Sequence, residues 1–163
     1  KTPPKVAWVE PAALHVTIKF IGEVGPEEVE RLRQQLAPPI ALAPFEPTWR
    51  GIGTFPSARN PRALWLGVTD GAAPLAAVEA EVSRRLAGVN WVELGGRAFL
   101  PHLTLGRVKM AGAGVDWPKV LKAVEVRYVT SIVDRVTLYR SQLSQQGPHY
   151  TGLVSAPLTS VAR

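Results

Sequence analysis

Two segments of the chain carry apolar residues at the spacing of an amphipathic helix. Residues 25–36 place Val29, Leu32 and Leu36 on one face, and Pro26 with two glutamates after it is typical of a helix start. Residues 74–86 place their leucines and valines at 75, 78, 82 and 86 on one face in the same way. A third, shorter helix is expected after Asp116, which has the chemistry of an N-cap and is followed by Pro118.

Runs rich in β-branched and aliphatic residues alternate with these helices and predict strands. They cover residues 15–20, 49–55, 63–68 and 102–107, and two more runs flank a predicted turn at 145–148. The segment 56–61 is dense in turn residues and is expected to be a loop. Helices that alternate with hairpins favour the α+β class with antiparallel or mixed sheets.

The order strand, helix, strand, strand occurs twice along the chain, which indicates an approximate duplication. Trp65 and Tyr150 fall at comparable places in the two copies. We expect residues 1–163 to form one bilobal domain in which each half carries its own version of this unit.

The two halves also share a short polar motif, His15-Val-Thr17 and His102-Leu-Thr104. Side chains two apart on a strand point to the same face, so each histidine is expected to share a face with its threonine. An imidazole can move a proton near neutral pH, and a hydroxyl can donate a hydrogen bond to a phosphate oxygen. A single His-x-Thr is more often structural, but the chain has only three histidines and two of them open this pattern. The pair therefore favours catalysis on a phosphodiester.

The residues around these motifs resemble the two-histidine (2H) phosphoesterases, and most closely the RNA 2′,3′-cyclic phosphodiesterases, which are also called 2′–5′ RNA ligases. The resemblance covers nearly the whole chain and rests on residues 8–11, 14–24, 97–107 and 138–141. It implies two pseudo-symmetric lobes, each a mostly antiparallel sheet with helices packed outside, and an active-site cleft between them. It also implies that about 20 residues, the size of one strand and one helix, precede Lys1.

The resemblance assigns roles to the motif residues. His15 is implied as the general acid and His102 as the general base, while Thr17 and Thr104 bind phosphate oxygens; the residues themselves leave open which histidine is which. Phe20 is implied to stack on the nucleobase and Arg107 to contact the phosphate. No metal or other cofactor is expected, because the sequence has no cysteine and no metal-ligand spacing of histidines.

Phe20 and Arg107 each follow a motif histidine by five positions, and strict alternation would place them on the opposite face. Either each strand bulges or ends before that position, or Phe20 is a core residue. His149, which has the look of a loop residue beside a strand, and Tyr150 are candidate substrate contacts. Arg59 and Arg62 in the predicted loop either reach the rest of the substrate or are simply solvated.

The composition agrees with a nucleic-acid substrate. The 163 residues carry a net charge of +6, and no run of like charges stands out, so a folded basic surface is expected rather than a basic tail. No apolar run approaches the length that spans a bilayer, and we expect a cytoplasmic monomer that acts on RNA or a nucleotide with a 2′,3′-cyclic phosphate end.

Three functions remain open at this point. The first is metal-independent hydrolysis of the cyclic phosphate to a 2′-phosphate. The second is the reverse direction, an ATP-independent 2′–5′ RNA ligation. The third is a non-catalytic RNA-binding module, against which the two intact His-x-Thr motifs argue.

Overall fold

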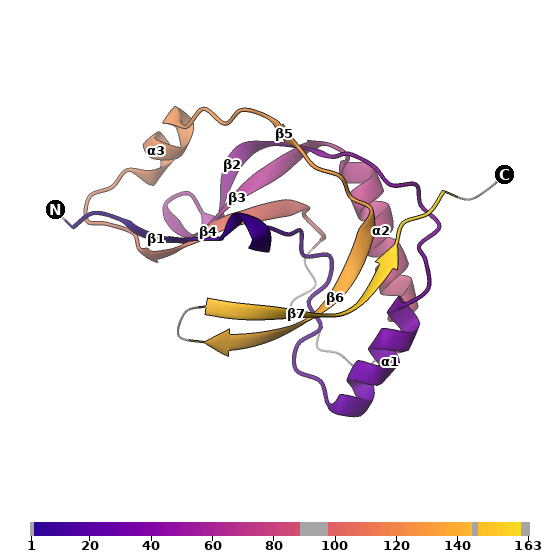
Figure 1. Cartoon of the computed structure of the whole chain (residues 1–163). Helices are drawn as coiled ribbons and strands as arrows, with labels where there is room; N and C mark the ends of the chain where they lie inside the picture. Colours follow the sequence, from indigo (N-terminus) through magenta and orange to yellow (C-terminus); the bar gives the residue numbers. More distant parts are fainter. Residues whose placement is uncertain (1, 89–97, 145–146, 161–163) are drawn as a thin grey trace. The chain divides into compact units, whose positions relative to one another are not determined.

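The computed structural model of the chain describes residues 2–88, 98–144 and 147–160 (Figure 1). Its elements, in order, are β1 (Lys5–Trp8), a short 3-10 helix η1 (Pro11–Ala13), α1 (Pro26–Leu36), β2 (Thr48–Ser57), β3 (Asn60–Asp70), α2 (Ala72–Arg85), β4 (His102–Met110), α3 (Trp117–Ala123), β5 (Val129–Thr130), β6 (Arg135–Ser144) and β7 (Gly147–Pro157). The predicted α+β class with antiparallel sheets is confirmed.

The chain divides into two compact units, and each is assembled from three separate segments. Unit 1 contains Lys1–Thr17, Pro47–Ala72 and Leu100–Ser131, and unit 2 contains Ile18–Glu46, Ala73–Phe99 and Ile132–Arg163. Both His-x-Thr motifs therefore lie in unit 1. The β2-β3 hairpin from the first half of the chain pairs with β4, the motif strand from the second half.

Unit 1 is built on a five-stranded antiparallel sheet in the order β1-β4-β3-β2-β5 (Figure 1). One face of this sheet is apolar and buried: Leu64 and Leu66 of β3 are buried, and they alternate with Trp65, which points to the other face. Trp49 of β2 and Trp117 of α3 are also buried, and their indole N–H groups donate to the Ser131 hydroxyl at 2.9 Å and to the Ala111 carbonyl at 2.9 Å.

Unit 2 packs α1, α2 and the β6-β7 hairpin around one apolar cluster. Both long helices were predicted from their periodicity. The cluster contains Leu32 and Leu36 of α1, Val78 and Val82 of α2, and Leu86 just past the end of α2, all of which were predicted to lie on the apolar faces. Leu75, also predicted to lie on that face, is buried outside this cluster. Ile40, Ala156 and Leu158 complete the cluster from the chain after α1 and the end of β7. α1 ends at Leu36 with Ala37 as its C-cap, directly before Pro38.

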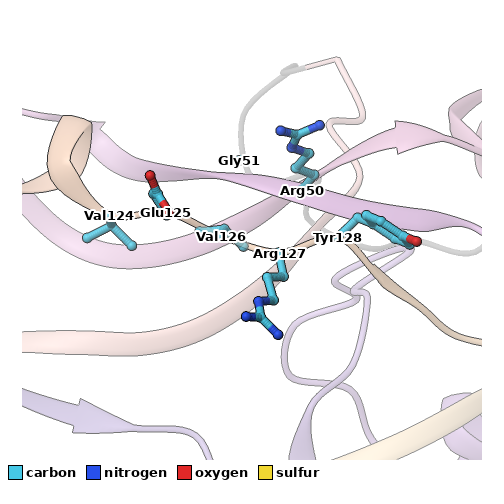
Figure 2. A pocket seen from close by; sticks show the side chains of 7 residues that line it. All are labelled: Arg50, Gly51, Val124, Glu125, Val126, Arg127 and Tyr128. Atoms are coloured by element: carbon cyan, nitrogen blue, oxygen red, sulfur yellow. The ribbon is translucent and has the colours of Figure 1, made fainter.

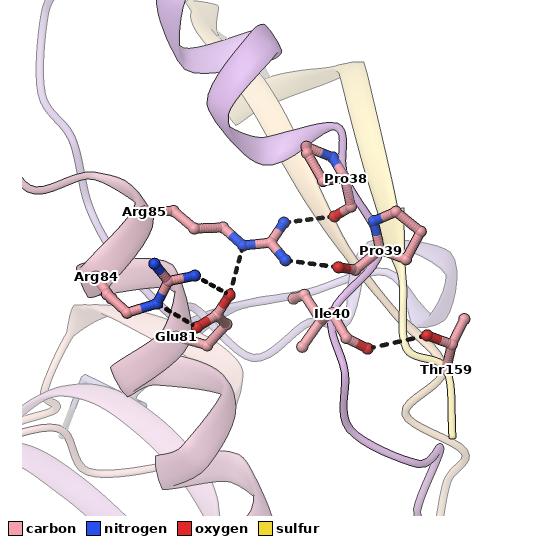
Figure 3. A network of polar contacts seen from close by, with 7 residues as sticks. All are labelled: Pro38, Pro39, Ile40, Glu81, Arg84, Arg85 and Thr159. Carbon is pink, nitrogen blue, oxygen red and sulfur yellow. Dashed lines mark hydrogen bonds and ion pairs between the residues drawn. The ribbon is translucent and has the colours of Figure 1, made fainter. Parts of the chain in front are cut away.

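A polar network fixes the end of α2 to the segment that follows α1 (Figure 3). The guanidinium of Arg85 donates to the Glu81 carboxylate at 2.8 Å, to the Pro38 carbonyl, and to the Pro39 carbonyl at 2.7 Å. Arg84 donates to the same carboxylate at 2.8 Å. These hydrogen bonds hold the pKa of Glu81 at about 2, the bond from Arg84 having the larger effect and that from Arg85 the smaller.

Three local predictions are corrected. The segment that carries His15 is not a regular strand, because only Val16 pairs with another strand. The loop expected at 56–61 is a tight turn at Ala58 and Arg59, with its flanking residues in β2 and β3. His149 lies within β7 and not in a loop, while Gln145 and Gln146 of the predicted turn, like Arg97 at the start of the second motif, lie outside the described residues.

Candidate active site

The two His-x-Thr motifs lie side by side in unit 1. Val16 and Leu103, the central residues of the motifs, form an antiparallel β-bridge. In an antiparallel pair, the residues before and after a bridged pair point to the opposite face from it. The bridge therefore places both histidines and both threonines together on one face, with each histidine across from the threonine of the other motif.

This pairing gives the four side chains a local two-fold arrangement. His15 and His102 occupy one diagonal of the set, and Thr17 and Thr104 occupy the other. Diagonal neighbours in an antiparallel pair are about 7–8 Å apart, which leaves room for one phosphate group between the two imidazoles. Two threonine hydroxyls flanking that space can donate to its non-bridging oxygens.

Each imidazole is held by the same backbone contact. His15 Nδ1 lies 2.8 Å from the Ala13 carbonyl oxygen, and His102 Nδ1 lies 2.7 Å from the Leu100 carbonyl oxygen. A carbonyl only accepts, so Nδ1 carries the proton in both rings and donates it. Nε2 is then the atom of each ring that gives or takes a proton in a reaction.

His102 is also enclosed by two aromatic side chains. The Phe55 ring lies edge-on to it with centroids 5.1 Å apart, and the Trp65 ring lies 5.9 Å away. Phe55 and Trp65 contact each other at 5.2 Å, so the three rings form one cluster on the histidine face of the sheet. His102 is half-buried as a result, whereas His15 is exposed.

Gly53 provides the space that the Trp65 ring occupies. The two residues are cross-strand partners in β2 and β3, and a Cβ atom on Gly53 would overlap the six-membered ring of Trp65. The indole Nε1 of Trp65 is buried and has no hydrogen-bond partner among the described residues. The indole therefore contributes to the site by packing beside His102 and not by hydrogen bonding within the described residues.

A bulge in β4 decides the position of Arg107. Thr104 is opposite Trp65 and Gly106 is opposite Leu64, so Leu105 is an extra residue in β4. Because of this extra residue, Arg107 is opposite Ala63, which lies on the Trp65 face of β3. Arg107 follows His102 by five positions and would lie on the opposite face of a regular strand. The bulge brings Arg107 to the face of His102 and Thr104, as one of the two alternatives had predicted.

The remaining predicted site residues lie in unit 2. Phe20 follows the point where the first motif leaves unit 1, and its side chain is 59% exposed, so it is not a core residue. His149 and Tyr150 are exposed residues of β7, opposite Gln142 and Ser141 of β6. The Tyr150 ring packs edge-on against Tyr139 at 6.1 Å.

Phe55 is the site residue that the sequence analysis missed. It lies within a predicted strand, but its role depends on the register of β2 against β3, which no local pattern reports. Trp65 was noted only for its place in the duplication. The pairing of Ala63 with both Phe55 and Arg107 is what brings the aromatic cluster and the arginine to one face.

A hollow in unit 1 lies where the segment before β5 passes β2 (Figure 2). It is lined by Arg50, Gly51 and the residues from Val124 to Tyr128. Figure 2 shows the side chains of Arg50 and Arg127 pointing in opposite directions, so they do not converge on one ligand. None of its lining residues belongs to the histidine face described above.

The match to known proteins agrees with this geometry. Residues 4–145 match the 2′-5′ RNA ligase superfamily. The chain belongs to this superfamily. Superfamily relatives named RNA 2′,3′-cyclic phosphodiesterase include one from Aeropyrum pernix, 34% identical over 156 residues that cover 95% of this chain and 88% of the relative. Another, from Thermus thermophilus, is 34% identical over 162 residues, 94% of this chain and 77% of the relative.

Solved structures with a similar fold are also found. A crystal structure from Thermus thermophilus matches with a TM-score of 0.71 at 29% identity, over 95% of this chain and 83% of that one. Escherichia coli LigT in complex with 3′-AMP matches with a TM-score of 0.67 at 25% identity, over 94% of this chain and 81% of that one.

Two further observations concern the part of this superfamily member that the structure describes. No three His, Asp or Glu side chains within residues 2–88, 98–144 and 147–160 lie together in a way that would hold a metal ion. No helix in the same ranges is long and apolar enough to cross a membrane.

Proposed function

We propose that this protein hydrolyses the 2′,3′-cyclic phosphate at the end of an RNA to a 2′-phosphate, with His15 and His102 as its acid and base and without a metal ion. Its relatives are named RNA 2′,3′-cyclic phosphodiesterase, and on this basis the protein is a hydrolase that acts on phosphodiester bonds. The observation that carries the mechanism is the antiparallel bridge between Val16 and Leu103, which brings the two histidines and the two threonines to one face.

The reaction needs one proton to be removed and another to be supplied on opposite sides of the phosphorus. Nε2 of a neutral His102 takes a proton from water as the water oxygen attacks phosphorus. The bond from phosphorus to the ribose 3′ oxygen breaks, and Nε2–H of a protonated His15 gives its proton to that oxygen. The products are a 2′-phosphate and a 3′-hydroxyl, and each histidine ends in the protonation state with which the other began.

The diagonal placement of the histidines suits this reaction. A phosphate between them meets one imidazole on the side of the attacking water and the other on the side of the leaving oxygen. The Nδ1 contacts to the Ala13 and Leu100 carbonyls aim both Nε2 atoms without using them. We assign the acid to His15 and the base to His102 on the family resemblance.

Thr17, Thr104 and Arg107 complete the site on unit 1 in this proposal, and substrate contacts are assigned to three residues of unit 2. Thr17 and Thr104 donate to the non-bridging oxygens, where charge builds in the transition state. Arg107 adds a planar cation that can make two parallel hydrogen bonds to the phosphate, and the bulge at Leu105 supports this role because it turns Arg107 to the same face. Phe20 offers an exposed ring for the base, and His149 and Tyr150 supply further substrate contacts.

The deciding experiment is hydrolysis of a nucleoside 2′,3′-cyclic phosphate in the presence of EDTA, with the product isomer identified by phosphorus NMR. We expect undiminished hydrolysis and a 2′-phosphate. Loss of activity that a divalent ion restores would overturn the metal-independent mechanism. A 3′-phosphate product would overturn the assignment of the leaving oxygen.

A further inference from the structure

We propose that the β2-β3 hairpin of unit 1 binds the RNA chain on the 5′ side of the cyclic phosphate, through Arg59 and Arg62, so that the protein prefers an oligonucleotide to a mononucleotide. This inference rests on the proposed function for the position of the terminal phosphate. It goes beyond that function because it names the part of the substrate that does not react and the surface that holds it.

The first observation is the distribution of charge between the two units. Unit 1 contains ten Lys and Arg residues against four Asp and Glu, whereas unit 2 contains nine of each. The whole net charge of +6 therefore lies in the unit that carries both His-x-Thr motifs. A charge concentrated in this way attracts a polyanion to that unit in particular.

The second observation is where the arginines of unit 1 lie along the sheet. His102 is level with Gly67 of β3, Thr104 with Trp65, and Arg107 with Ala63. Continuing along β3 in the same direction leads past Arg62 to Arg59 in the turn of the hairpin. Arg62 is an extra residue in β3, because Ala63 is opposite Phe55 and Pro61 is opposite Pro56, so this exposed arginine does not follow the alternation that buries Leu64 and Leu66. At about 3.3 Å per residue, the turn lies about 20 Å from the level of Thr104.

The third observation is that these cations are not committed to partners within the protein. Arg59, Arg62 and Arg107 are exposed, and none of them makes an ion pair within the ranges that the structure describes. The exposed arginines of α1 in unit 2 differ in this respect, because Arg31 and Arg33 each pair with a glutamate three residues before.

The direction in which Arg107, Arg62 and Arg59 follow one another along the hairpin fits the chemistry of the substrate. A 2′,3′-cyclic phosphate is by definition on the last ribose of a strand, so the rest of the RNA leaves the site on the 5′ side only. A single strand that leaves the phosphate position beside Arg107 and follows β3 would bring successive phosphates to Arg62 and Arg59. Arginines that neutralise phosphates release the counterions condensed on the RNA, and this makes such binding depend on salt.

The test compares two substrates that share the same reacting end. One is cytidine 2′,3′-cyclic phosphate, and the other is a single-stranded RNA of about eight nucleotides that ends in the same group. We expect kcat/KM to be higher for the RNA. For the Arg59→Gln/Arg62→Gln variant, we expect kcat/KM for the RNA to fall about tenfold at low salt and that for the mononucleotide to stay unchanged.

The salt dependence gives a second readout. Each phosphate contact to a single strand contributes about 0.7 to the slope of log affinity against log salt, so the double variant should lower that slope by about 1.4. Arg31→Gln/Arg33→Gln is the matched control, because it removes the same charge from unit 2, and it should leave both substrates and the slope unchanged.

Two results would overturn the inference. One is an equal loss of kcat/KM for the RNA in the Arg31→Gln/Arg33→Gln control and in the Arg59→Gln/Arg62→Gln variant. The other is an Arg59→Gln/Arg62→Gln variant that keeps the full preference for the RNA over the mononucleotide. Failure of the proposed function is distinguishable, because it would abolish hydrolysis of both substrates by the wild-type protein. In that case, fluorescence anisotropy with an RNA that ends in a 2′-phosphate still tests the hairpin. Loss of affinity in the hairpin variant alone would support the surface, and unchanged affinity would overturn it.

Discussion

Val16 and Leu103, which are 87 positions apart in the sequence, are paired with each other at the centre of two matching motifs. Neither side chain has any chemistry to offer the reaction. Their pairing nevertheless determines where the neighbouring side chains lie. The two histidines and two threonines that flank Val16 and Leu103 all point to the face opposite to these two side chains. The placement of both histidines on one face therefore follows from the backbone pairing of Val16 with Leu103.

Replacing either motif histidine should remove most of the activity. We expect His15→Ala and His102→Ala each to lower kcat at least about a hundredfold, because a positioned acid or base supplies roughly 10²–10⁴ in rate. Steady-state kinetics on a cyclic mononucleotide measures this, with circular dichroism to check that each variant is folded. His149→Ala is the matched control: it removes the third histidine and should raise KM with little effect on kcat. A folded His102→Ala variant with full activity would contradict the mechanism.

The aromatic cluster should act on the reaction through His102. Phe55→Leu removes the ring that lies edge-on to the imidazole, and we expect kcat to fall about tenfold with KM nearly unchanged, because small misplacements of a reacting group are costly. Trp65→Phe should have a smaller effect, since the indole N–H has no partner among the described residues. Phe45→Leu, in unit 2, should lower only the melting temperature. An equal loss of kcat in this control would indicate a general loss of stability instead.

Phe20 should contribute to substrate affinity and little to stability. Its side chain is largely exposed, so Phe20→Ala should leave the melting temperature nearly unchanged. Loss of a stacking contact of about 1–3 kcal/mol should weaken binding by about fivefold or more, and similarly for all four bases, as titration calorimetry with 2′-nucleotides would measure. Phe20→Tyr, which keeps the ring, should bind normally. The opposite pattern, a large fall in melting temperature with normal binding, would argue against base stacking.

Arg107 should affect turnover more than binding. Its positive charge opposes charge that grows in the transition state, so Arg107→Ala should lower kcat more than it raises KM. Arg107→Lys should recover only part of the loss, because an ammonium group cannot reproduce the planar fork of a guanidinium. Lys109→Ala, two residues further along β4, controls for the loss of one cation near the same strand. Full recovery of kcat by lysine would indicate that only charge matters at this position.

The network of Glu81, Arg84 and Arg85 should stabilise unit 2 in a pH-dependent way. The hydrogen bonds from Arg84 and Arg85 lower the pKa of Glu81 from its usual 4.5 to about 2 in the folded protein, so the stability that Glu81 contributes is present above pH 4.5 and is lost as the pH falls towards 2. Glu81→Gln should therefore lower the free energy of unfolding at pH 7 and have little effect near pH 2. Arg85→Met should cost about 2 kcal/mol, because it leaves two carbonyls without their charged donor. Arg33→Gln removes the exposed ion pair between Arg33 and Glu30, whose atoms are 3.8 Å apart, and it should lower the free energy of unfolding much less. Urea titrations of the variants measure these differences.

The sequence predicted the parts of this protein that depend on local patterns. Apolar spacing identified α1 and α2 with their buried leucines, and Asp116 does cap α3, where its carboxylate accepts from the Lys119 amide at 3.1 Å. The His-x-Thr pair was found by repetition alone. What the sequence could not supply was register. The bulge at Leu105 and the neighbours of His102 are set by which residues of β3 and β4 face each other, and this depends on contacts far apart in the chain.

The same dependence on distant segments bears on how the protein is made. A chain emerging from the ribosome exposes His15 and Thr17 early, but their pairing partner is not synthesised until Leu103 follows. Until then unit 1 lacks β4, the strand that lies between β1 and β3 and completes the middle of its sheet. Folding of unit 1 thus waits for the second motif, and contacts of such long sequence separation form slowly. A nascent chain that stops at residue 99 contains the entire first motif and the hairpin, yet the first motif still lacks its pairing partner.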